Sequence, residues 1–401
     1  MSEAAAPTPP AAGPPPVAQT SPDDKKRFNS QGLIVSIITT TIAFLVGGLV
    51  VLATGHDPFG TYRAIFNGTG ITWLIPGYGD RAASATNFQQ TLLETTPLIL
   101  CGLAVAFAFR CGMFNIGGQG QYFAGSYAAL IFGSYWAGIP GPAHIVLCIV
   151  LAIIAGAAWG GIAGFLKATT GAHEVISTIM LNWIAIWIGT YFFGLQGPFV
   201  SSQYSPISNT IVDNVHLPVF WGDPVLQGLH IGFFIAIGAL VVFWAILNRT
   251  TLGFEVRAVG FNPEAARYSG INVKRNYFLA MAISGAFAGL AGGIDILGWQ
   301  FQIATPDILV STVGFLGIAV ALLGRNSAVG VFFAALLFGA LTVGTSSRQL
   351  DPSVFDPQLA GNLTLIIQGL VVLFVGADLM VLAIWKSRKK LSFRRKENVE
   401  T

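Results

Sequence analysis

Charged residues are scarce in this chain. Only 10% of its 401 residues are Asp, Glu, Lys or Arg, whereas 53% are apolar. A soluble globular protein has about 25% charged residues, so this composition predicts an all-α, polytopic membrane protein. The formal net charge of +3 is also too small to indicate a nucleic-acid partner.

Cysteine is scarce too, and the residue patterns of enzymes are missing. Cys101, Cys111 and Cys148 lie in or beside apolar runs without metal-ligand spacing, so neither a disulfide framework nor a zinc site is indicated. The sequence has no GxxxxGK[ST] phosphate loop, no HExxH and no nucleophile elbow, and its five histidines form no plausible Ser/His/Asp set. We therefore expect no catalytic residue, metal or cofactor here, and no ATP binding through a phosphate loop.

Long apolar runs fill most of the sequence. Because about 20 apolar residues cross a bilayer as a helix, we expect about ten spans with both termini in the cytoplasm. Their predicted ranges are 33–53, 91–109, 114–134, 143–166, 175–195, 229–248, 276–297, 308–324, 327–346 and 362–385. The third, eighth and ninth spans are short or glycine-containing, which is compatible with broken or re-entrant helices.

The distribution of positive charge supports this topology. With ten alternating spans, every Lys and Arg except Arg63, Arg81 and Arg348 falls on the cytoplasmic side, as the positive-inside rule requires. One missed or extra span would scramble this division.

The chain therefore divides into three parts. Residues 1–30 are rich in Ala, Pro and Ser and are predicted to be a disordered cytoplasmic tail. Residues 31–385 are predicted to form the transmembrane domain, and residues 386–401 a basic cytoplasmic tail. The external segments 54–90 and 196–228 are rich in aromatic residues or proline, and we expect ordered caps that either lie at the membrane interface or dock a soluble partner.

Ionisable side chains are nearly absent from the middles of the predicted spans. Glu94 and Asp295 are expected near outer ends, and Glu174 and Asp378 toward inner ends. Since intramembrane charges usually mark ion or proton pathways, the absence of a buried carboxylate or basic residue weakens a secondary-transporter hypothesis and favours a neutral solute.

Uncharged polar residues cluster at the start of the third span and in the fifth. Four glycines among the amides near residues 113–122 make a poor straight helix, and unwound backbone at membrane depth is tolerated only where it lines protein or water. These amides either line a pathway for a polar, uncharged solute or satisfy neighbouring helices. The candidate pathway residues are Asn115, Gln119, Gln121, Asn182 and Trp183.

Two spans carry the same glycine spacing. The fourth has Gly156, Gly160 and Gly164, and the seventh has Gly285, Gly289 and Gly293. Small residues at every fourth position share one helix face and permit close backbone approach. They indicate either two equivalent helices beside a pathway or generic close packing.

A polar, charged loop at residues 249–275 interrupts the apolar sequence. Asn262 can cap a helix, Pro263 suits its first position, Glu264 favours its N-terminal end and Gly270 supplies a left-handed stop. We expect a helix of about two turns between two spans. It is either an ordinary cytoplasmic loop or a segment that something outside the membrane grips.

This loop resembles a known motif. Residues 260–272, Gly-Phe-Asn-Pro-Glu-Ala-Ala-Arg-Tyr-Ser-Gly-Ile-Asn, resemble the cytoplasmic coupling loop of bacterial ABC importer permeases of the ribose and branched-chain amino acid class. The openings of the third and fifth spans, at residues 115–120 and 174–182, resemble more specifically the nucleoside/simple-sugar permease subgroup. The resemblance covers roughly residues 90–385.

The resemblance implies a complex in the bacterial cytoplasmic (inner) membrane. It would contain two permease subunits, the second a paralogue or another copy, with ABC ATPase subunits inside and an extracytoplasmic substrate-binding protein outside. Carried over residue by residue, the coupling region comprises Arg257, Gly260, Asn262, Pro263, Glu264, Ala265, Ala266, Arg267 and Gly270. The two arginines could meet acidic ATPase residues, or they could simply be cytoplasmic positive charges.

The resulting hypothesis is a permease subunit of an ATP-driven importer that moves a neutral polar solute, first of all a nucleoside, by alternating access. The alternatives are a simple-sugar permease, an ATPase-independent secondary transporter or channel, and a structural membrane scaffold.

Overall fold

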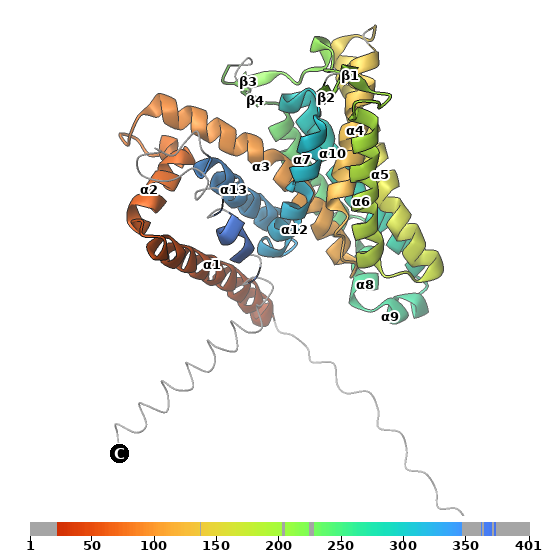
Figure 1. Ribbon diagram of the computed structural model, residues 1–401. Helices are drawn as coiled ribbons and strands as arrows, with labels where there is room; N and C mark the ends of the chain where they lie inside the picture. The colour runs from red at the N-terminus through yellow and green to blue at the C-terminus, as the bar shows by residue number, and fades with distance from the viewer. Residues whose placement is uncertain are drawn as a thin grey trace, which may run out of the picture.

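The computed structural model describes residues 22–136, 138–202, 205–223, 228–346, 362, 365–370 and 373. Most of the predicted tenth span and all of the basic C-terminal tail lie outside these residues. The described chain is predominantly helical, with two short two-stranded sheets (Figure 1), which confirms the prediction of a helical membrane protein.

Helices occur at each described position where a span was expected. They are α1 (Pro22–Ala53), α3 (Arg81–Arg110), α4 (Gly118–Tyr135), α5 (Gly141–Thr170), α6 (Glu174–Phe193), α7 (Gly232–Arg249), α10 (Val273–Asp295), α11 (Thr305–Val310) with α12 (Val313–Leu323), and α13 (Ala328–Gly344). Six of the described helical segments are long and apolar enough to cross a membrane, while the apolar parts of α1 and α13 are shorter. The number ten and the side on which the termini lie therefore stay predictions.

Helix α1 begins earlier than expected. The predicted tail of residues 1–30 overlaps it, because the helix starts at Pro22. Proline suits the first position of a helix, and Asp23 and Asp24 in its first turn favour the positive end of the dipole. Residues 1–21 lie outside the described chain.

The two segments that were predicted to be external meet at one end of the molecule. The first contains α2 (Pro58–Gly68) and η1 (Ile71–Leu74); the second contains β1 (Val200–Ser202), β2 (Ser205–Ser208), η2 (Asp213–Val215) and β3 (Val219–Trp221). Strand β4 (Leu229–His230) follows the second segment, at the start of the predicted sixth span, which begins as a helix only at Gly232. The ring of Trp73 lies 4.9 Å from that of Trp221, and the antiparallel pairs β1–β2 and β3–β4 order the second segment. The described parts of these segments are thus folded caps, as the sequence indicated.

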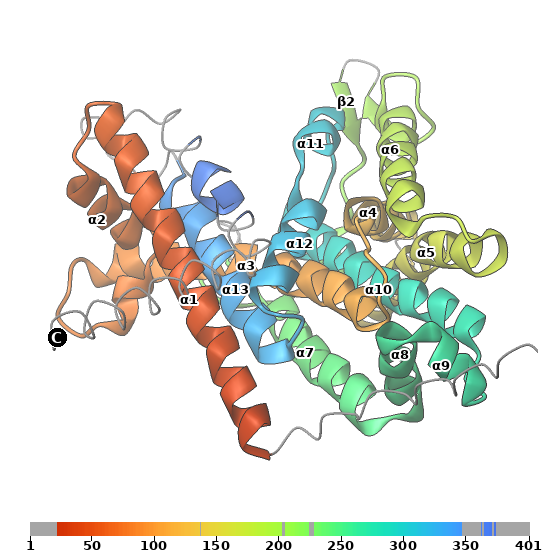
Figure 2. The same cartoon turned by 90° about the horizontal axis from the view of Figure 1, so that it is seen from below.

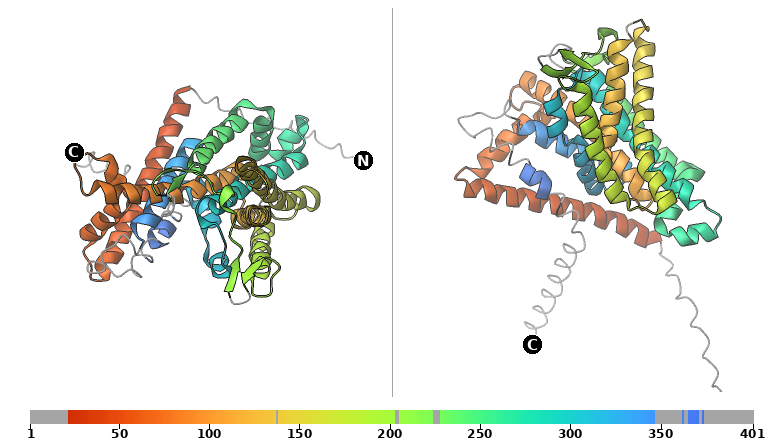
Figure 3. Two further views of the ribbon diagram at one scale, coloured as in Figure 1. Left: turned by 90° about the horizontal axis from the view of Figure 1, so that it is seen from above. Right: turned by 45° about the vertical axis from the view of Figure 1, so that its right-hand side comes forward.

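The opposite end carries two short helices, α8 (Thr251–Phe261) and α9 (Pro263–Tyr268) (Figures 1 and 3). Only the second was expected. The Thr250 hydroxyl caps α8 by accepting a hydrogen bond from the Gly253 amide at 3.1 Å. More of the polar loop is therefore helical than the cap pattern at residues 262–270 predicted.

Helix α10 lies in the middle of the bundle, between α3 and α5 (Figure 2). The predicted glycine ladders face each other there: a Cβ on Gly285 would overlap the Gly156 backbone, and a Cβ on Gly156 would lie 2.6 Å from Cα of Gly289. On its other side α10 touches α4, where a Cβ on Gly125 would overlap Gly289. The ladders therefore give close backbone packing of three helices.

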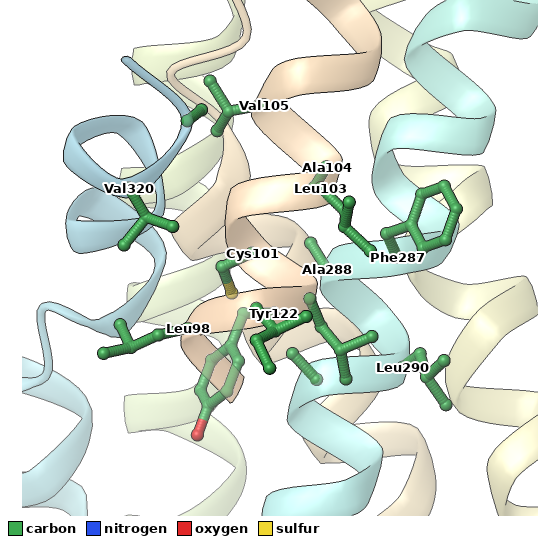
Figure 4. Close-up of a cluster of buried hydrophobic side chains, with 14 of the residues drawn as sticks. Leu98, Cys101, Leu103, Ala104, Val105, Tyr122, Phe287, Ala288, Leu290 and Val320 are labelled. Carbon is green, nitrogen blue, oxygen red and sulfur yellow. The ribbon is translucent and has the colours of Figure 1, made fainter. Parts of the chain in front are cut away.

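Apolar side chains complete the core around α3. Figure 4 shows Leu98, Cys101 and Leu103 of α3 between Val320 of α12 and Phe287 of α10. All five are buried. This helix is almost completely enclosed, with 89% of its most apolar window buried, so it cannot present a broad face to lipid.

Two of the three uncertain spans are interrupted. Residues 114–117 are not helical and α4 starts only at Gly118, while Ser311 and Thr312 separate α11 from α12. The ninth span, α13, is one continuous helix. Helix α10 passes at its outer end into a π-helical turn, η4 (Ile296–Gln300), which stops at Phe301 in the left-handed region at φ 57°.

Candidate functional site

Helix α9 is a short, capped helix that stands at the surface. Asn262 Oδ1 accepts hydrogen bonds from the amides of Glu264 at 3.0 Å and Ala265 at 3.1 Å. The helix ends where Gly270 takes φ 84°, and the Ile271 amide donates to the Ala266 carbonyl at 3.0 Å. The sequence therefore specifies both ends of this helix.

The exposed face of α9 is partly aromatic. Phe261 is 95% exposed and Tyr268 92% exposed, although both are large hydrophobic residues. Glu264 and Arg267 are exposed beside them and form an ion pair of 3.5 Å, whereas Ala266 is buried against the bundle. Neither aromatic was predicted from the sequence as a functional residue, although an aromatic residue in an otherwise polar loop is a recognisable signal of a contact surface.

The remaining coupling candidates join this surface to the bundle. A Cβ on Gly260 would overlap the Arg110 carbonyl and come within 2.9 Å of the Gly112 nitrogen, so α8 lies directly against the end of α3. Arg257 donates to Asn248 Oδ1 at 3.1 Å, which ties α8 to α7 rather than leaving its guanidinium free. In addition, Asn276 at the start of α10 donates to Glu255 Oε2 of α8 at 2.9 Å.

Four of the five predicted pathway residues form one buried group. Asn115, Gln119, Gln121 and Asn182 are each at most 2% exposed. Asn115 Nδ2 donates to Gln121 Oε1 at 2.8 Å and to Ser284 Oγ of α10 at 2.6 Å. The amide groups of this cluster are thus paired with one another and with neighbouring helices.

Asn182 and Gln119 satisfy backbone groups around the start of α4. Asn182 Oδ1 accepts from the Gly120 amide at 2.8 Å, and its Nδ2 donates to the Ile116 carbonyl at 2.9 Å. Gln119 Oε1 accepts from the Gly314 amide at 2.7 Å and its Nε2 donates to Ser311 Oγ at 3.1 Å. These bonds supply the partners that interrupted helices need inside a membrane, and they link the break before α4 to the break between α11 and α12.

Trp183 lies apart from this cluster. Its side chain is 54% exposed and borders a shallow apolar hollow on the outer face of α6, together with Met180, Ile184, Trp187 and Tyr191. Consecutive helix residues point about 100° apart, which explains why Trp183 faces outward while Asn182 faces inward. The assignment of all five residues to a solute pathway stays a prediction.

Asp295 corrects the expectation that no span holds a buried carboxylate. It is 1% exposed at the end of α10, where Tyr122 Oη donates to its Oδ2 at 2.7 Å and Trp299 Nε1 to its Oδ1 at 3.3 Å. Gln300 Nε2 in turn donates to Tyr122 Oη at 3.3 Å. The expectation was wrong because position near the end of a span was taken as exposure, whereas η4 and the external caps cover this end.

Beside this network is a cavity of about 470 Å³. Its lining comes from α3, α4, η4, the following loop and α11, segments that lie far apart in the sequence. The polar members are Glu94, Tyr122, Ser126, Gln300, Gln302, Asp307 and Ser311, and the aromatic ones include Phe123 and Trp299. None of the described lining residues is Lys, Arg or His. A cavity of this size and mixed polarity suits a small molecule.

Comparison with known proteins shows which family this chain is similar to. The family model for the permease component of branched-chain amino acid transport systems matches residues 87–376. Guanosine ABC transporter permease protein NupP of Bacillus subtilis is 37% identical over 371 residues, covering 89% of this chain and 97% of NupP.

Two further relatives are similar over most of their length. Nucleoside ABC transporter permease protein NupB of Lactococcus lactis is 33% identical, covering 88% of this chain and 93% of NupB. Glucose ABC transporter permease protein TsgB13 of Haloferax volcanii is 34% identical, covering 84% of this chain and 86% of TsgB13. No solved structure matches this chain.

Proposed function

Because the chain belongs to the family of permease components of branched-chain amino acid transport systems, we propose that it is the membrane-spanning permease subunit of an ATP-driven importer for nucleosides. Its partners are ABC ATPase subunits, a second permease subunit that is a paralogue or another copy, and an extracytoplasmic substrate-binding protein. The names of NupP and NupB support a nucleoside as the solute, and the name of TsgB13 supports a simple sugar as the second candidate.

The observation that carries the proposal is the surface of α9. Two aromatic side chains more than 90% exposed flank a helix whose ends are both fixed by caps. Exposed large apolar side chains with a polar rim are typical of protein interfaces. We therefore assign α9, with Phe261, Tyr268, Glu264 and Arg267, to docking on the ATPase.

The attachment of α8 supports a mechanical role for this surface. The contact of Gly260 with Gly112 and the bond from Asn276 to Glu255 join the loop to the ends of α3 and α10. Those two helices are central in the bundle and bear much of its core. Movement of a docked ATPase would thus be passed to α3, which lines the cavity, and to α10, which continues into the lining turn η4.

The docking assignment is tested with Phe261→Ala and Tyr268→Ala. Neither side chain contributes to the described core, so the variants should still fold. For the double variant, ATPase co-purification and ATP-dependent uptake in reconstituted vesicles should each fall at least tenfold, because aromatic anchors of an interface are commonly worth more than about 1 kcal/mol each. Phe59→Ala, which removes a ring 87% exposed at α2, is the matched control and should change neither.

Equal ATPase association for the double variant and Phe59→Ala would contradict the docking assignment. The solute is tested separately, by uptake of labelled guanosine and labelled glucose into vesicles that contain the whole complex, each in competition with the other. Uptake of glucose without uptake of guanosine would favour the second candidate.

A further inference from the structure

We propose that the cavity bordered by Glu94, Trp299 and Asp307 is the solute site within the membrane domain, where carboxylates accept hydrogen bonds from the hydroxyl groups of a nucleoside's ribose and the indole of Trp299 stacks on its base. This inference rests on the proposed function, because it concerns the site at which the same solute is held.

The hydrogen-bonding inventory of the cavity favours a ligand with several hydroxyl donors. Glu94 has no hydrogen-bond partner among the described residues, and Asp307 is exposed at the cavity with no described ion pair. An ionised carboxylate only accepts hydrogen bonds. In their ionised form these two carboxylates, with no cation among the described lining residues, therefore need donors from a ligand or from water.

The remaining polar groups are largely occupied by one another. Tyr122 Oη donates to Asp295, Gln300 Nε2 donates to Tyr122 Oη, and Ser311 Oγ accepts from Gln119. These bonds hold their side chains in place. These bonds give the cavity a fixed frame, and we assign the carboxylates of Glu94 and Asp307 as its acceptors for solute hydroxyl groups.

The charge of the cavity excludes phosphorylated solutes. Its described lining contains two carboxylates and no Lys, Arg or His, and the Asp295 carboxyl lies close enough to Glu94 to interact with it electrostatically. A phosphate or a free carboxylate in the same space would face like charge in a partly desolvated setting, which is unfavourable. The ligand class is therefore a neutral, hydroxylated molecule rather than a nucleotide or an amino acid.

The aromatic members select a flat ring. Trp299 Nε1 is bonded to Asp295 at 3.3 Å, which fixes the orientation of the indole at the border of the cavity. Phe123 lines the same space and stacks on Tyr127 at 5.7 Å between ring centroids. An oriented aromatic plane beside hydroxyl acceptors fits a base joined to a sugar better than a sugar alone.

The π-helical turn explains how Trp299 and Gln300 come to face the cavity. If the α-helix continued past Asp295, these side chains would point in a different direction. Instead η4 ends at Phe301, which adopts a left-handed conformation that is uncommon for a bulky residue. Phe301 is held there by stacking on His216, with ring centroids 4.0 Å apart. π-helical turns of this kind occur frequently at functional sites.

The test compares wild type with Glu94→Gln in vesicles that contain the same ATPase and binding protein. The half-saturating concentrations for uptake of guanosine and its 2′-deoxy and 3′-deoxy analogues are measured. If Glu94 accepts a ribose hydroxyl, wild type prefers guanosine over at least one deoxy analogue, and Glu94→Gln reduces that preference by roughly tenfold or more, the usual worth of a hydrogen bond to a charged group. Because the binding protein is unchanged, its own selectivity cancels.

A second arm separates the base from the sugar. Trp299→Leu should weaken guanosine uptake by roughly tenfold, as loss of a stacked base does, but weaken glucose competition less. Trp299→Phe retains a ring and should lie between Trp299→Leu and wild type. Asp213→Asn, an exposed carboxylate outside the cavity, is the control and should leave every value unchanged.

The outcomes are distinguishable. If wild type carries neither nucleosides nor sugars, the proposed function fails. If wild type carries guanosine but Glu94→Gln keeps the full deoxy discrimination, and Trp299→Leu affects guanosine and glucose equally, the proposed function survives and the cavity assignment is overturned. ATPase association and thermal midpoint are measured for each variant, and a discrimination ratio is compared only between variants that retain both.

Discussion

Substitution of Gly289 by Ala should weaken the contact between α10 and α5. The added Cβ would lie 2.8 Å from Cα and 3.0 Å from N of Gly156 and would overlap the Ala152 carbonyl. Ordinary carbon contacts lie at about 3.5–4.0 Å, so α5 and α10 would have to separate by about 1 Å. Gly289 also touches Gly125 of α4, so α10 has no room to retreat.

The expected cost is about 1–3 kcal/mol, the usual penalty for overfilling a packed core. Ala is a better helix former than Gly by about 1 kcal/mol, which opposes the clash and has to be measured separately. Gly238→Ala in α7 measures this gain in helix propensity without a clash, because nothing lies within 4 Å of its added Cβ. In detergent, thermal unfolding should occur several degrees lower for Gly289→Ala than for Gly238→Ala. Equal midpoints would refute the close packing of the two ladders.

Three further predictions concern the loop, the external cap and the amide cluster. Gly270→Ala places a Cβ at φ 84°, at a cost of about 1–2 kcal/mol, and should lower the amount of solute transported per ATP hydrolysed. Gly171→Ala introduces the same kind of strain at φ 72° in another loop and should leave that ratio unchanged. Burial lowers the pKa of His230 to about 4 from 6.5, so the unfolded chain binds the proton first. The contribution of His230 to the free energy of unfolding should then be fully present above pH 6.5 and fall as the pH drops toward 4, by up to about 3 kcal/mol. His230→Asn should remove this part of the pH dependence of the thermal midpoint. Asn182→Leu leaves buried backbone groups unpaired and should cost about 1–3 kcal/mol in thermal stability, while Trp183→Leu on the exposed face should cost little; equal losses would contradict the assigned orientations.

Local patterns predicted the features whose causes are local. The cap at Asn262 and the stop at Gly270 depend on backbone groups within a few residues, and the structure has both. The glycine spacing identified the faces on which α5 and α10 pack closely, because small residues at every fourth position share one face and permit close backbone approach, but it did not identify the partner of either face. The interruption before Gly118 followed from the glycines and amides around it.

Features that depend on contacts between distant segments were not predictable in the same way. The burial of Asp295 requires Tyr122 from α4 and the turn of η4, and hydropathy measures neither. The cavity combines Glu94 with Trp299 and Asp307, which are more than two hundred residues apart from it in the chain. Asn182 and Trp183 are adjacent on α6, so their side chains point about 100° apart, and the contacts of Asn182 with the start of α4 decide which of the two faces inward.

One helix connects the three parts of the proposed mechanism. At the start of α10, Asn276 donates a hydrogen bond to Glu255 of α8. In its middle α10 packs through Gly285 and Gly289 against α5, and Asp295 lies at its end. Backbone packing without intervening side chains leaves little slack, because close-packed interiors transmit displacement rather than absorb it. A displacement of α8 and α9 by a docked ATPase would therefore reach Trp299 as a movement of α10 with α5, not as local bending of the loop. Within this arrangement the glycine ladders do more than hold the fold, since they couple α10 closely to α5 between the docking surface and the cavity.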